Sequence, residues 1–132
     1  MRVEAHLENL QESVREVERA VQEGLLQNQR SLGFHASAAA VDMLEIILHE
    51  RRLIDPGFVI KHEWFNSAKK IAEKFPFDFP KKKEILVLVS QIENVRNTFC
   101  YGKRQSEEAL ESVITAFNTL KQLFFEVTGH EI

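Results

Sequence analysis

The fold is decided by the stretch Phe34-His35-Ala36-Ser37-Ala38-Ala39-Ala40-Val41-Asp42-Met43-Leu44-Glu45-Ile46-Ile47-Leu48. Apolar residues cover more than one face of a helix over residues 34–53. Such a wide apolar surface is typical of a helix in the middle of a bundle or at a subunit contact. The three consecutive alanines would let a neighbouring backbone approach closely. This stretch therefore indicates a bundle with the helix near its centre.

Other helices are expected on both sides of this stretch. Apolar residues recur at alternating steps of four and three over residues 3–25 and again over residues 110–127. We expect Ser31-Leu32-Gly33 to end the first helix, and Asp55-Pro56-Gly57 to form a turn after the second. A short helix is predicted over residues 63–75 and a longer one over residues 81–99. Ser106 is expected to cap the last helix, and Gly129 to end it.

Together these patterns predict an all-α fold. No stretch alternates with period two for long enough to indicate a sheet. We expect one domain over residues 1–132, an antiparallel up-and-down helical bundle of four main helices plus one short helix.

Composition places the chain among soluble globular proteins. It has 44% hydrophobic and 28% charged residues, and its one cysteine, Cys100, allows no intramolecular disulfide. The N-terminus lacks the apolar run of a secretory signal, and no apolar stretch approaches the roughly 18 residues that span a bilayer. We therefore expect a cytoplasmic protein with no membrane partner.

Charge is distributed unevenly along the chain. The net charge is −3, but residues 51–104 hold 12 basic and 6 acidic side chains, a local balance of +6. Such a segment can attract phosphate locally, although a solvated lysine surface is the simpler explanation.

Residues with metal-ligating side chains occur on the second helix. Asp42, Glu45 and His49 share one helical face, but one helix supplies too few ligands, so we interpret them as a helix-surface salt bridge. His6 and His130 have no neighbouring pattern to interpret. No glycine-rich phosphate loop or Ser/His/Asp signature occurs. We predict no metal and no cofactor.

The candidate functional stretch is Arg96-Asn97-Thr98-Phe99-Cys100-Tyr101-Gly102, at the end of the predicted helix 81–99. Arg96 borders the apolar stripe of that helix, where its guanidinium could hold a phosphate through two hydrogen bonds. The alternative is an arginine that only complements the negative end of the helix dipole. Lys103 and Arg104 follow as candidate flanking phosphate contacts.

Three segments of the chain resemble the HEPN family of small helical nucleotide- and RNA-associated domains. Residues 33–48 are similar to the family's second helix, Lys61-His62-Glu63-Trp64 to the start of its next helix, and Arg96-Asn97 to its Arg-polar motif. The resemblance covers about residues 20–128. It implies a prokaryotic protein that forms a homodimer. Some members of the family are toxins that a minimal nucleotidyltransferase antitoxin neutralises.

In ribonuclease members of this family a histidine follows the arginine by four to six residues. Here that window holds Tyr101, Gly102 and Lys103, and a tyrosine is a poor general base near neutral pH. The resemblance therefore implies a dimeric domain that binds RNA or nucleotide phosphate through Arg96, Asn97 and Tyr101, with weak or no metal-independent ribonuclease activity. Two alternatives are a protein-interaction module that partners a nucleotidyltransferase or itself, and an active ribonuclease with an unconventional base.

Overall fold

A computed structural model describes residues 1–132, and it confirms the all-α fold. Five α-helices and two short 3₁₀ segments account for its regular structure. In chain order they are α1 (Val3–Glu23), η1 (Leu26–Asn28), α2 (Gln29–Glu50), η2 (His62–Asn66), α3 (Ala68–Lys74), α4 (Lys82–Tyr101) and α5 (Glu107–Thr128).

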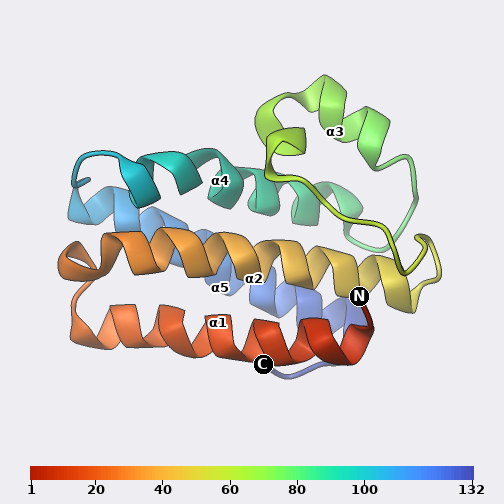
Figure 1. Ribbon diagram of the computed structural model, residues 1–132, viewed down its shortest axis with the longest axis horizontal. Helices are drawn as coiled ribbons and strands as arrows, with labels where there is room; N and C mark the ends of the chain where they lie inside the picture. Colours follow the sequence, from red (N-terminus) through yellow and green to blue (C-terminus); the bar gives the residue numbers. More distant parts are fainter.

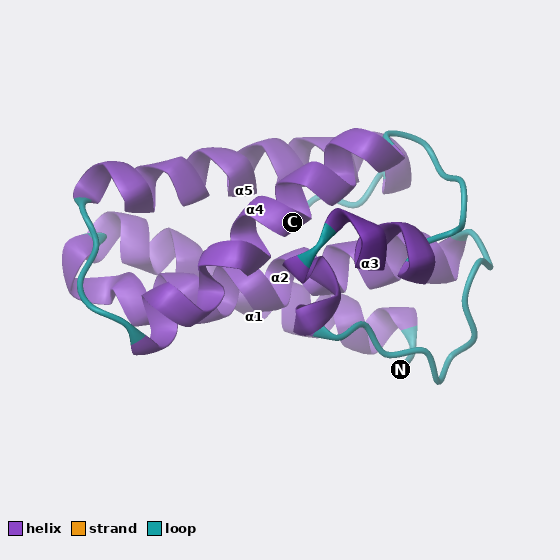
Figure 2. Ribbon diagram, turned by 90° about the horizontal axis from the view of Figure 1, so that it is seen from above, coloured by secondary structure: helices purple, strands orange, loops and turns teal.

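The four long helices form an antiparallel bundle. α1, α2, α4 and α5 lie side by side, and each runs opposite to the long helix before it in the chain (Figure 1). The short helix α3 lies outside this bundle and covers one end of α4 (Figure 2). The long connection between α2 and α4, which carries η2 and α3, is thus the part of the chain that departs from a plain four-helix bundle.

α2 is the central helix. It contacts α1, α4 and α5, and almost every residue from Met43 to Leu48 is fully buried. The expectation that no stretch approaches membrane-spanning length is wrong, because by length and hydropathy the helical stretch Leu26–Glu50 could cross a membrane. However, 67% of its apolar window is buried inside the bundle, as in the core helix of a soluble protein. Most of its wide apolar surface is therefore covered by its neighbours in the same chain, with Phe34 as an exposed exception.

The predicted break at Ser31-Leu32-Gly33 is wrong. The first helix ends at Gly24, whose φ of 117° only glycine adopts readily, and α2 already begins at Gln29. Gly33 instead lies where α2 meets α4, because a Cβ atom there would be 2.5 Å from the Cβ atom of Phe99. This glycine allows close helix packing rather than ending a helix.

The predicted helix 63–75 is two shorter elements. Ser67 is extended and accepts a hydrogen bond from the amide of Lys70, so it ends η2 and caps α3. Aromatic packing holds this segment against the bundle: the ring of Phe75 lies 5.9 Å from that of Trp64 and stacks on Phe65 at 5.6 Å. This packing fixes the position of η2 against the bundle.

The predicted ends of the last helix are confirmed. The hydroxyl of Ser106 accepts from the amide of Ala109 at 3.2 Å, and Gly129 adopts the left-handed conformation that follows a helix. The turn at Asp55-Pro56-Gly57 is also present, since the amide of Phe58 donates to the carbonyl of Asp55 at 2.9 Å.

Candidate functional site

Arg96 and Asn97 lie in the last two turns of α4. The guanidinium of Arg96 donates to Oδ1 of Asn97 at 3.2 Å, and Arg96 is only partly exposed. Both side chains line a polar groove of about 330 Å³ between α4 and η2, together with Lys61, His62, Glu63, Asn66 and Glu93. No hydrophobic residue lines this groove.

The groove contains an oriented histidine. Nδ1 of His62 lies 2.5 Å from Oε2 of Glu93, and the hydroxyl of Ser37 donates to the other carboxylate oxygen at 2.5 Å. Because a carboxylate only accepts hydrogen bonds, Nδ1 carries a proton, and in the neutral form of the ring Nε2 is the nitrogen with the free lone pair. Glu93 is 7% exposed, whereas the His62 side chain is 46% exposed. A buried carboxylate thus holds an accessible imidazole at the same groove as Arg96.

Three separate elements supply this arrangement. Ser37 lies on α2, His62 opens η2 and Glu93 lies on α4, three residues before Arg96. Sequence reasoning singled out Lys61-His62-Glu63-Trp64 only through the family resemblance, and it missed Ser37 and Glu93. The one available signal was the i, i+3 spacing of Glu93 and Arg96, which places them on the same side of α4.

The other predicted site residues lie apart from this groove. Tyr101 is 73% exposed at the end of α4, and Lys103 and Arg104 are exposed in the loop that follows. None of the three lines the groove. The loop is held by the buried Gln29 of α2, whose side chain donates to the carbonyl of Lys103 at 2.9 Å and accepts from the amide of Gln105 at 2.6 Å.

Tyr101 lines a second hollow of about 420 Å³ between α2 and α4. Phe34, which is 52% exposed, and Arg30 and His35 lie in the same hollow. Cys100 also reaches it, but burial raises the pKa of its thiol more than Arg96 and Arg30 lower it. The thiol therefore stays protonated near neutral pH, which argues against a nucleophilic cysteine.

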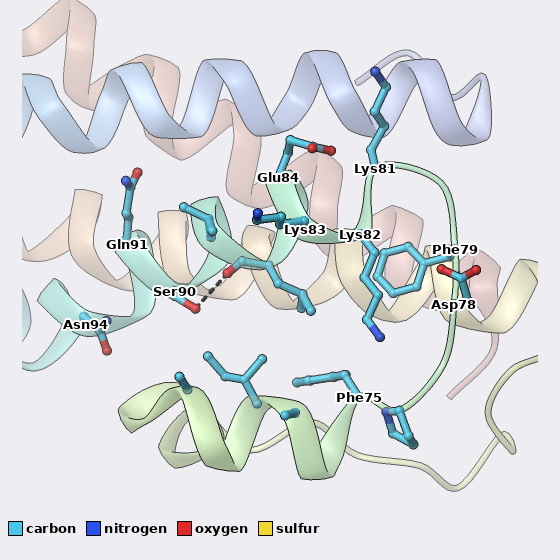
Figure 3. Close-up of a pocket in the computed structure, with 16 residues that line it drawn as sticks. Phe75, Asp78, Phe79, Lys81, Lys82, Lys83, Glu84, Ser90, Gln91 and Asn94 are labelled. Carbon is cyan, nitrogen blue, oxygen red and sulfur yellow. Dashed lines mark hydrogen bonds between the residues drawn. The ribbon is translucent and has the colours of Figure 1, made fainter.

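The largest groove of the molecule lies elsewhere. About 920 Å³ in volume, it runs between α3 and the start of α4, with Phe75 and Phe79 on its wall and Lys81 and Lys82 at one end (Figure 3). Ser90, at its other side, donates its hydroxyl to the carbonyl of Leu86. Lysines and the carboxylates of Asp78 and Glu84 line this groove beside its apolar wall.

A further polar cluster, separate from these grooves, lies between α1 and α2. Nδ1 of His6 is 2.7 Å from Oδ1 of Asp42, and Nε2 of His6 is 2.8 Å from Oε2 of Glu45. The prediction of a helix-surface salt bridge for Asp42, Glu45 and His49 is therefore wrong, because α1 covers this face of α2. Burial raises the pKa of Asp42, and burial together with the charge of His6 lowers the pKa of His49.

Comparison with protein-family models, with curated proteins and with solved structures finds no match to this chain.

Proposed function

We propose that the groove between η2 and α4 binds an RNA phosphodiester, with Arg96 as the phosphate-binding residue and His62 as an acid–base group. The observation that carries this proposal is that His62, oriented by Glu93, lines the same groove as Arg96. The HEPN resemblance expects an imidazole beside this arginine, and His62 would supply it from another part of the chain.

Arg96 would bind two phosphate oxygens with its planar guanidinium. Asn97 supports that role because its side-chain oxygen accepts a hydrogen bond from the guanidinium and restricts its orientation. Lys61 adds a second positive charge to the groove, whereas Glu63 adds a negative one. With His62 neutral, the charges of Arg96 and Lys61 balance those of Glu63 and Glu93, so attraction for a phosphate would come from the two cations locally and not from a net positive charge of the groove.

The reaction that this site could support is attack of the RNA 2′-oxygen on the adjacent phosphorus. Nε2 of His62 would take the proton of the 2′-hydroxyl as the new P–O2′ bond forms. The P–O5′ bond breaks to leave a 2′,3′-cyclic phosphate, and the leaving 5′-oxygen takes up a proton from water. Arg96 would offset the negative charge that grows on the phosphoryl oxygens. Because each chain supplies only one oriented imidazole, we expect RNA cleavage to be slow even where RNA binds well.

The direct test is to incubate the purified chain with a mixed RNA pool in EDTA and to measure both binding and cleavage. Arg96→Ala should weaken RNA affinity at least tenfold and reduce the slope of log affinity against log salt by about one. Arg19→Ala, which removes an exposed arginine of α1 paired with Glu16, is the matched control and should change neither.

Two outcomes separate the parts of this proposal. If Arg96→Ala binds RNA with wild-type affinity and salt dependence, the phosphate site is wrong. If the wild type binds RNA and leaves it intact over hours, His62 has no acid–base role and the groove is a binding site alone.

A second candidate function is protein pairing, which the hollow with Phe34 and Tyr101 favours because both aromatic side chains are largely exposed there. A second copy of this chain or a minimal nucleotidyltransferase are the partners that the resemblance suggests. Light scattering at micromolar concentration would show a dimer that Phe34→Ser dissociates. A monomer at every concentration would exclude self-pairing.

A further inference from the structure

The cluster between α1 and α2 plays no part in the proposed RNA site. His6 comes from the first turns of α1, while Asp42, Glu45 and His49 follow one another at steps of three and four along α2. The side chains of His6 and Glu45 are 5% and 8% exposed. One imidazole and one carboxylate are thus enclosed beside an otherwise apolar core, with Asp42 and His49 partly exposed next to them.

Two hydrogen bonds fix the orientation of this cluster. Asp42 accepts from Nδ1 of His6 at 2.7 Å, which directs Nε2 of that ring toward α2. The backbone amide of Ile60 donates to Oε1 of Glu45 at 3.0 Å, which leaves Oε2 facing the histidines. Nε2 of His6 and Oε2 of Glu45 are therefore held in place, because the other polar atom of each side chain is hydrogen-bonded.

Two buried nitrogen atoms in the cluster have no hydrogen-bond partner. They are Nε2 of His6 and Nε2 of His49. Nε2 of His6 lies 2.8 Å from Oε2 of Glu45 but without the alignment of a hydrogen bond. The two rings stack with their centroids 5.7 Å apart and their planes at 30°. Buried polar atoms normally have hydrogen-bond partners, so two unpaired nitrogen atoms beside one carboxylate need a physical explanation.

We propose that Nε2 of His6, the carboxylate of Glu45 and His49 bind one divalent transition-metal ion, with Zn²⁺ the best suited. One ligand atom from each of these residues lies within 4.8 Å of the other two. Two imidazole nitrogens and one carboxylate oxygen, with a fourth position for water, form a ligand set that zinc accepts. Small rotations of the side chains would bring the three atoms to the roughly 2.0–2.2 Å that zinc requires.

Asp42 would be a positioning residue for this ion. Metal-binding histidines commonly donate their other ring N–H to a carboxylate, which fixes the tautomer and strengthens the ligand. The contact between Asp42 and His6 has that form. An ion here would join α1 to α2, so we expect binding to stabilise the fold.

The competing explanation is a protonated His6 shared between Asp42 and Glu45, with no ion. That ion-pair arrangement does not involve His49 and leaves Nε2 of His49 without a partner. His49 is therefore the residue that separates the two explanations. Replacing it removes no hydrogen bond of the cluster, so His49→Ala should fold.

The experiment is a titration of the full-length, metal-free chain with Zn²⁺, followed by calorimetry and by competition with a chromogenic chelator. We expect one Zn²⁺ per chain and a melting temperature that rises with Zn²⁺. Loss of His49 should weaken Zn²⁺ affinity at least tenfold, and Asp42→Asn should weaken it by about 10–100-fold. Co²⁺ should give the visible absorption of a four-coordinate site in the wild type and lose it in His49→Ala.

The matched control is His130→Ala, which removes a histidine that pairs with Glu50 at the surface, 2.8 Å away. It should bind Zn²⁺ as the wild type does. A chain that takes up no stoichiometric Zn²⁺, or a His49→Ala variant with wild-type affinity, would overturn the proposal in favour of the ion pair. Neither result bears on the RNA groove, which is assayed in EDTA.

Discussion

The two histidine–carboxylate clusters use the same groups in different surroundings. In the groove, Glu93 is buried but His62 is half exposed and lines the same groove as Arg96. Between α1 and α2, the whole of the His6–Glu45 pair is buried and a second histidine faces it. Exposure suits the first cluster to exchange protons with a substrate, and enclosure suits the second to hold an ion.

The clusters also differ in which helices they join. Ser37, His62 and Glu93 depend on the contact of α2 with α4 and η2, whereas the enclosed cluster depends on the contact of α2 with α1. Each can therefore be disturbed without the other, and four changes test how independent they are.

Glu45→Ala should have the largest effect on stability. It removes the carboxylate that lies 2.8 Å from Nε2 of His6 and that accepts from the amide of Ile60, and both His6 and Ile60 are buried. Breaking a buried pair in this way costs about 3–5 kcal/mol in the free energy of unfolding. Urea denaturation followed by circular dichroism measures this value, with Glu50→Ala as the exposed control. A loss below about 1 kcal/mol would mean that the cluster is solvated.

Gly33→Ala should destabilise the fold by about 1–3 kcal/mol, because the added methyl group meets the Cβ atom of Phe99 at 2.5 Å and α4 must shift. The shift would separate Glu93 from Ser37, which is one turn beyond Gly33 on α2. RNA binding should therefore weaken while Zn²⁺ affinity in the folded protein stays unchanged. Equal losses in both assays would show that the clusters are not independent.

Glu93→Gln should cost about 1–2 kcal/mol in unfolding free energy and act mainly on chemistry. The amide can donate to Nδ1 of His62, which would reverse the tautomer and leave Nε2 protonated toward the groove. RNA cleavage should disappear while Arg96-dependent binding changes less than about threefold, a difference below 1 kcal/mol. Gel-based cleavage and fluorescence anisotropy on the same samples compare the two, and unchanged cleavage would rule out the Glu93–His62 pair.

The smallest effect should be a pH dependence that arises from His49. Burial lowers its pKa from 6.5, so the unfolded chain binds more protons than the folded one as the pH falls through that value. Stability should therefore fall from about pH 7.5 to about pH 5.5, by less than 1 kcal/mol from this group. His49→Gln should flatten the slope of melting temperature against pH in metal-free buffer. A slope equal to that of the wild type would assign the dependence to other groups.

The helical pattern made the bundle predictable. Steps of three and four placed α1, α4 and α5 correctly to within a few residues, and the wide apolar surface of residues 34–53 indicated the central helix. The capping residues Ser106 and Gly129 marked the ends of α5, because local hydrogen bonds and backbone conformation define a helix end.

Glycine was the point at which sequence reasoning failed in the fold. Gly24 and Gly33 are both glycines near the predicted end of the first helix, so the sequence does not distinguish them. Gly24 ends a helix through its positive φ, whereas Gly33 lies inside a helix against Phe99. Only the neighbouring helix distinguishes them. The same applies to η2 and α3, where tertiary packing of Trp64, Phe65 and Phe75 replaced one continuous helix by two short elements.

The sequence by itself determined the all-α class, the order of the long helices and the position of Arg96 and Asn97 near the end of α4, since each depends on residues within one or two turns. Only the tertiary structure decided which histidines meet which carboxylates. His62 reaches Glu93 across 31 positions and His6 reaches Asp42 across 36. Periodicity describes the faces of one helix and contains no information about which face of another helix will cover it.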